Sequence, residues 1–159
     1  MSAINVGIGD LAVSADRTAQ IKTYALGSCV AVIAWDRVNK VAGLIHIALP
    51  ESAINTDKAT EKPGYFADSG IPVFLQELVA RSAAKSFLSI RLAGGSSIMD
   101  DKHHFDIGKR NVLAIRKLLW KHGLGTIAED VGGNISRTVT VDVATGEVVI
   151  NSAGRQWTL

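Results

Sequence analysis

The 159-residue sequence lacks several features that would assign it to common classes of protein. It contains a single cysteine, Cys29, so no disulfide can form within the chain, and a reducing cytoplasm is the expected location. No apolar run approaches the ~20 residues that a membrane-spanning helix needs, and the N-terminus lacks the basic leader of a secretory signal. The net charge is only +2, and no run of lysine and arginine indicates a nucleic-acid partner.

The sequence does contain enough apolar residues for a well-formed core. Hydrophobic residues make up 47% of the chain, and no repeat, low-complexity segment or linker divides it. Short strand-like runs alternate with two longer segments of helical periodicity, at about 68–84 and 107–122. We therefore expect one domain, residues 1–159, of the mixed α/β class with two main helices.

Two apolar runs hold the residues of greatest chemical interest. Residues 29–35 and 41–49 are rich in valine and isoleucine and predict two strands. The polar residues 36–39 between them favour a turn, so the two strands are expected to form a hairpin.

The register of this hairpin decides whether a site exists. With a loop at 36–39, Trp35 faces Lys40 and Cys29 lies directly opposite His46, on the same face of the sheet. A loop one residue longer would place His46 opposite Val30, with its side chain on the other face.

A thiol beside an imidazole is a recognised arrangement for nucleophilic catalysis. An imidazolium favours the thiolate, and the same ring can then protonate a leaving amine. Gly27 and Ser28 precede the thiol of Cys29, and backbone N–H groups there are candidates for stabilising an oxyanion. Thr23 stands six residues before Cys29, so an extended chain would bring both to one face, where the hydroxyl could orient His46. Burial in a core explains a lone cysteine and a lone histidine equally well.

Three other segments carry chemically interesting residue types. The polar stretch 51–64 follows the second strand and is either a lid over the site or a plain connection. The Gly94–Ser97 segment predicts a tight turn after a strand, because no phosphate-binding spacing surrounds it. The cluster at 100–106 contains metal-binding residue types without metal-site spacing, and solvated loop residues explain it, so no metal and no cofactor is expected.

Several motifs, in the same order along the chain, resemble the chemoreceptor glutamine deamidase family, CheD. They are VGIGDLAVS at 6–14, LGSCV at 26–30, GLIHIALP at 43–50, LAGGSSIM at 92–99 and IGKRN at 107–111. The resemblance implies a three-layer α/β/β sandwich. It also implies a catalytic Cys29, His46 and Thr23, which hydrolyse glutamine side-chain amides of methyl-accepting chemotaxis receptors to glutamate and ammonia.

The resemblance also implies partners, and it leaves two other functions open. Receptor cytoplasmic helices are the implied substrate, and a CheC-type phosphatase is a further partner that the resemblance suggests. One alternative is a non-catalytic chemotaxis adaptor that binds receptors or that phosphatase. The other is a thiol amidase of the transglutaminase kind, because an acyl-thioester also reacts with amines.

Overall fold

The computed structural model describes residues 2–98 and 106–159. These residues form ten strands: β1 Ser2–Asn5, β2 Leu11–Ser14, β3 Ala19–Leu26, β4 Val30–Asp36, β5 Val41–Ile47, β6 Leu88–Gly94, β7 Thr126–Val131, β8 Arg137–Asp142, β9 Val148–Ser152 and β10 Arg155–Thr158. The same residues form three α-helices, α1 Thr56–Glu61, α2 Ala67–Ala80 and α3 Ile107–Lys121, and three short 3₁₀ helices, Ser52–Ile54, Pro63–Tyr65 and Lys85–Phe87. None of the helices in this part of the chain is long and apolar enough to cross a membrane.

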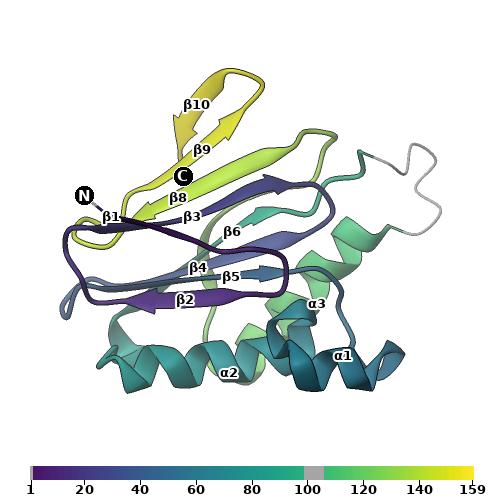
Figure 1. Ribbon diagram of the computed structural model, residues 1–159, viewed down its shortest axis with the longest axis horizontal. Coiled ribbons are helices and arrows are strands. Elements are labelled where there is room, and N and C mark those ends of the chain that lie inside the picture. Colours follow the sequence, from purple (N-terminus) through teal and green to yellow (C-terminus); the bar gives the residue numbers. More distant parts are fainter. Residues whose placement is uncertain (1, 99–105) are drawn as a thin grey trace.

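The strands form two sheets that pack face to face, with the helices outside one of them (Figure 1). The first sheet has the order β1-β3-β8-β9-β10, and the second has the order β2-β5-β4-β6-β7. Helices α2 and α3 cover the outer face of the second sheet, so the layers run helices, second sheet, first sheet (Figure 1). The expected three-layer α/β/β sandwich is confirmed.

The central strand β4 separates two cores and explains why its sequence is apolar without alternation. Val30, Val32 and Ala34 pack with the helices, while Ala31 and Ile33 pack against the first sheet. Both faces of this strand are therefore buried, as in other sheets that are covered on each side.

The predicted hairpin is present, but its register differs from the expected one. The loop has four residues, at 37–40 instead of 36–39, because Asp36 belongs to the strand and pairs with Val41. The Asp36 carboxylate accepts hydrogen bonds of 2.8 Å from both Val38 N and Asn39 N, and this fixes the turn one residue later.

The register change moves the partner of His46 but keeps its face. His46 pairs with Ala31, so the prediction that it lies directly opposite Cys29 is wrong. The loop begins and ends one residue later than expected. Each residue of β4 therefore pairs with a residue of β5 that is two positions further along the chain than expected. Cys29 lies two residues before Ala31, so it is diagonal to His46 on the same face. It also lies just before Val30, the first residue of β4.

Other element boundaries also differ from the expectation. The stretch 51–64 is not a plain connection, because it contains the 3₁₀ helix Ser52–Ile54, α1 and the start of the 3₁₀ helix Pro63–Tyr65. Helix α2 ends at Ala80 instead of about residue 84, since Ser82 has a left-handed φ of 75°. Pro72 lies within this helix, beyond its first turn. Strand β10 is an element that the sequence does not predict.

Candidate active site

The segment that carries the cysteine is held by two other parts of the chain. The three consecutive carbonyl oxygens of residues 27–29 each accept a hydrogen bond. The donors are Ser96 N at 2.8 Å to Gly27, Asn111 Nδ2 at 3.0 Å to Ser28, and Gly95 N at 2.8 Å to Cys29. The backbone on both sides of the thiol is therefore fixed. Whether the N–H groups of Gly27 and Ser28 stabilise an oxyanion stays a prediction.

The Gly94–Gly95 pair makes this attachment possible. Gly94 has a φ of 116° and Gly95 a φ of 64°, which L side chains rarely adopt. A Cβ on Gly94 would also clash with the carbonyl oxygen of Cys29. The predicted tight turn after β6 is not found, because the N–H groups of residues 95–97 donate to neighbouring segments; the two glycines instead allow the β6 end to approach the cysteine segment.

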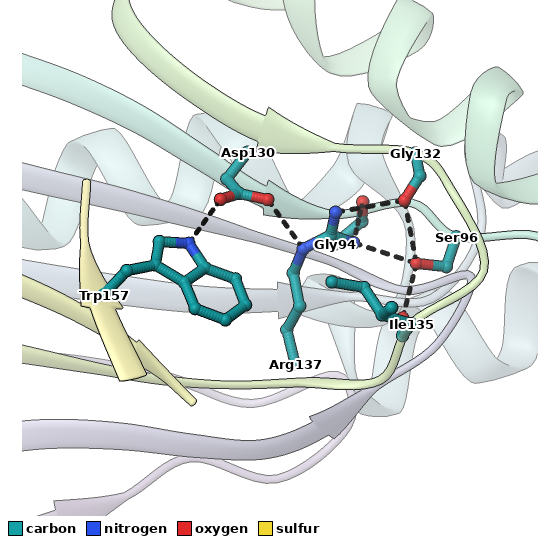
Figure 2. A network of polar contacts seen from close by, with 7 residues as sticks. All are labelled: Gly94, Ser96, Asp130, Gly132, Ile135, Arg137 and Trp157. Carbon is teal, nitrogen blue, oxygen red and sulfur yellow. Dashed lines mark hydrogen bonds and ion pairs between the residues drawn. The ribbon is translucent and has the colours of Figure 1, made fainter. Parts of the chain in front are cut away.

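A buried arginine fixes the 94–96 segment in turn (Figure 2). Arg137, only 4% exposed, donates from Nη1 to Ser96 Oγ at 2.8 Å and to Gly94 O at 3.1 Å. Its Nε donates at 2.9 Å to Asp130, whose other carboxylate oxygen accepts from Trp157 Nε1 at 2.6 Å. A buried charge needs such a full set of partners. The network joins Arg137 on β8 and Trp157 on β10 to the 94–96 segment, which in turn is bonded to the backbone around Cys29.

The imidazole of His46, on β5, contacts the hydroxyl of Thr23, on β3 of the other sheet. Thr23 Oγ1 lies 2.7 Å from His46 Nδ1 and 2.7 Å from the carbonyl oxygen of Val6. A carbonyl can only accept, and a hydroxyl has one hydrogen, so Thr23 donates to Val6. His46 Nδ1 must then carry the proton and donate to Thr23, which assigns the neutral tautomer with an unprotonated Nε2.

The predicted pairing of Thr23 with His46 is thus present, but the expected route to it is wrong. Thr23 lies on β3 of the first sheet, and Cys29 precedes β4 of the second sheet, so no extended chain connects them. The ladder between β3 and β8 is irregular between Thr23 and Leu26, where Ala25 has a φ of 54°. The chain crosses to the second sheet just after this irregularity, and Thr23 reaches His46 across the space between the sheets.

Burial keeps both reactive groups in their neutral forms. It lowers the pKa of His46 to about 4, against a smaller opposing effect of the Asp10 carboxylate. Burial also raises the pKa of the Cys29 thiol. The expected resting pair of thiolate and imidazolium is therefore disfavoured, and the imidazole and the thiol are both neutral at neutral pH. Such an imidazole acts as a general base at the moment of attack.

His46 Nε2 is the unused atom of this arrangement. It is buried and has no hydrogen-bond partner among the described residues, and His46 as a whole is 2% exposed. Such an unprotonated, unpartnered ring nitrogen can accept the proton of the half-buried Cys29 thiol, which is diagonal to His46 on the same face of the sheet.

Two supporting residues lie outside the set that the sequence predicts. Asn111 and Arg137 are polar and buried, and each contacts the cysteine segment directly or through one intermediate. The helical spacing of Asn111 relative to the buried Gly108, Val112 and Ile115 is a sequence signal that it faces the core.

The acidic and histidine cluster expected at 100–106 falls mostly on residues that the structure does not describe. Asp100, Asp101, His103 and His104 lie outside the described residues. Within residues 2–98 and 106–159, no group of three or more metal-binding side chains is arranged to hold an ion.

Comparison with known proteins gives a matching family model and several relatives of similar sequence. Residues 48–152 match a family model described as CheD chemotactic sensory transduction. A probable chemoreceptor glutamine deamidase CheD of Syntrophotalea carbinolica is 48% identical over 99% of this chain and 99% of its own length. Probable deamidases of the same family from Anaeromyxobacter dehalogenans and Syntrophus aciditrophicus are 45% and 42% identical, over 96% and 97% of this chain and 96% of each relative. A solved structure from Neisseria meningitidis, protein NMB0706, is 11% identical with a TM-score of 0.47, and the match covers 84% of this chain and 63% of that one.

Proposed function

The chain belongs to the CheD family, and on that premise we propose that it is a protein-glutamine deamidase of chemotaxis receptors. The relatives of similar length that are named as chemoreceptor glutamine deamidases support this function. The single structural observation that carries it is the hydrogen bond from His46 Nδ1 to Thr23, which leaves Nε2 free as a base.

The proposed reaction begins with attack by Cys29. Sγ bonds to the side-chain carbonyl carbon of a receptor glutamine, while the thiol proton passes to His46 Nε2. The tetrahedral oxyanion collapses, the carbon–nitrogen bond breaks, and the amine takes the proton from His46 and leaves as ammonia. A thioester between Cys29 and the receptor side chain remains.

Hydrolysis completes the reaction and restores the site. His46 Nε2 accepts a proton from water as the water oxygen bonds to the thioester carbon. The carbon–sulfur bond then breaks, the sulfur regains its proton, and the side chain departs as glutamate. Thr23 takes no proton in either half; it keeps the imidazole in the tautomer that both halves require.

Removal of the nucleophile separates this enzyme from a receptor-binding adaptor. Cys29→Ala should abolish ammonia release from receptor cytoplasmic fragments and leave binding to them intact, because the change is small and at a half-buried position. Cys29→Ser should be nearly as inactive, since a hydroxyl is a much weaker nucleophile. An unmutated protein that binds the fragments but releases no ammonia would support the adaptor alternative instead.

Two further features of the function rest on the family alone. We propose a cytoplasmic location, where the receptor segments with the target glutamines are accessible. We also propose a CheC-type phosphatase as a second partner. Co-elution of the two purified proteins on a sizing column tests that partner, and separate elution at concentrations well above micromolar would exclude it.

A further inference from the structure

Asn111 on α3 makes an unusual pair of contacts with the two segments that carry the proposed catalytic groups. Its Nδ2 donates to Ser28 O and to Ala48 O, at 3.0 Å in each case. Ser28 directly precedes Cys29, and Ala48 follows His46 by two residues. Asn111 is 0% exposed, so no solvent competes for these bonds.

The two carbonyls lie where the β4–β5 ladder ends. Val30 and Ile47 are its last paired residues. Beyond them the strands diverge: Ala48 N donates to Tyr65 O, and Gly27 O accepts from Ser96 N. The ladder therefore no longer sets the distance between the segments, and the side chain of Asn111 bridges them instead.

Few side chains could make this bridge. Two carbonyl oxygens need two hydrogens from one atom, and among buried side chains of this size only an amide nitrogen supplies them. An aspartate carboxylate has no hydrogen to donate to either carbonyl, and a serine hydroxyl could donate to only one of the two. The two acceptors also fix the orientation of the amide, so its Oδ1 points away from both carbonyls.

We infer that Asn111 is a positioning residue for the Cys29–His46 pair, acting through the backbone of Ser28 and Ala48. The inference rests on the proposed deamidase function. Nucleophile and base must lie within hydrogen-bond reach during attack, and displacement by about 1 Å can cost roughly a hundredfold in rate. The bridge holds the two segments at the separation that this reaction needs.

The test compares Asn111 with a buried polar residue at the other end of the same hairpin. Asp36 is also 0% exposed, and its carboxylate accepts from Asn39 Nδ2 and Ala84 N, far along the strands from the cysteine. Asn111→Ser and Asn111→Asp are the test variants, and Asp36→Asn is the control. Each is assayed for thermal unfolding, for kcat and KM of deamidation, and for the rate of Cys29 alkylation by iodoacetamide.

We expect kcat of the Asn111 variants to fall about ten- to a hundredfold, with KM changed less than about twofold. Asn111→Asp should be the more impaired, because its carboxylate repels both carbonyls. The alkylation rate at neutral pH should fall as well. Asp36→Asn should lower the unfolding temperature without changing either rate. Equal kcat values for folded Asn111 variants and the control would overturn the inference and leave Asn111 a purely structural residue.

A measurement on the unmutated protein applies even if the variants do not fold. Alkylation of Cys29 should shift the side-chain amide signals of Asn111 in a ¹H–¹⁵N spectrum, and the Asn39 side-chain signals at the far turn should stay in place. Unshifted Asn111 signals would contradict the coupling. Alkylation and these spectra do not depend on a receptor substrate, so an absence of deamidation would refute the proposed function without deciding this inference.

Discussion

Replacing Thr23 by valine tests the assignment of the histidine tautomer. The change keeps the branched shape of the side chain and removes its hydroxyl oxygen. In the native protein this oxygen lies 2.7 Å from His46 Nδ1 and 2.7 Å from Val6 O. A buried carbonyl without a partner costs about 1–3 kcal/mol, so the free energy of unfolding should fall by that amount. The hydrogen bond to Nδ1 is worth about 0.5–1.5 kcal/mol net, and without it the proton can move to Nε2. Because 1.4 kcal/mol corresponds to tenfold, kcat should fall about two- to tenfold, and not to zero.

Nitrogen-15 spectra of the imidazole report the tautomer directly. The native protein should show a protonated Nδ1 and an unprotonated Nε2 at His46, and Thr23→Val should populate the reverse tautomer. Thr23→Ser is the matched control, because it restores the hydroxyl, and it should keep both the native tautomer and most of kcat. A native His46 with its proton on Nε2, or unchanged kcat in Thr23→Val, would refute the reasoning.

Three further perturbations follow from the same contacts. The pKa of His46 falls from 6.5 to about 4 on folding, so its contribution to stability is complete above pH 6.5 and is lost as the pH falls toward 4. Urea titrations should show that His46→Gln is less sensitive to pH over this window, by up to about 3 kcal/mol, and parallel curves would contradict the burial effect. Gly94→Ala should cost about 1–3 kcal/mol of stability because its φ is 116°, and it should also lower kcat by displacing Cys29; native values of both would show that the backbone adapts. Arg137→Met should destabilise by about 3 kcal/mol, because it removes the cationic partner of the Asp130 carboxylate and one hydrogen-bond donor each from Gly94 O and Gly132 O; a midpoint in urea within error of the native one would show that the network contributes nothing.

The sequence predicts the central hairpin well because burial on both faces leaves a clear pattern. Residues 29–35 and 41–49 are apolar nearly throughout, and the structure places β4 and β5 within one residue of each predicted start. Its register was less predictable, since Asp36 is a common turn residue and here ends a strand. Cys29 and His46 still share a face because the observed register differs from the predicted one by two positions, and residues two apart in a strand point to the same side.

Contacts between the two sheets were beyond the reach of sequence patterns. Thr23 meets His46 only because β3 and β5 belong to different sheets that pack face to face, and strand periodicity describes one sheet at a time. Arg137 shares the inward face of β8 with Val139 and Val141, but arginine is a residue type that is usually exposed, and only the fold shows the partners that its charge meets between the layers. The role of Thr23 was predicted from its spacing to Cys29 and from the family resemblance, and the spacing argument chose the right residue for a geometric reason that the fold does not support.

Mass spectrometry of receptor fragments incubated in ¹⁸O-labelled water tests the central claim most directly. We predict that glutamines of the cytoplasmic fragments become glutamates that contain one ¹⁸O atom from the hydrolysis of the thioester, and that Cys29→Ala prevents this. An N-substituted glutamine, formed when an amine in place of water attacks the thioester, would indicate transglutamination. Unmodified glutamines after incubation with the native protein, or the same conversion by Cys29→Ala, would contradict the account.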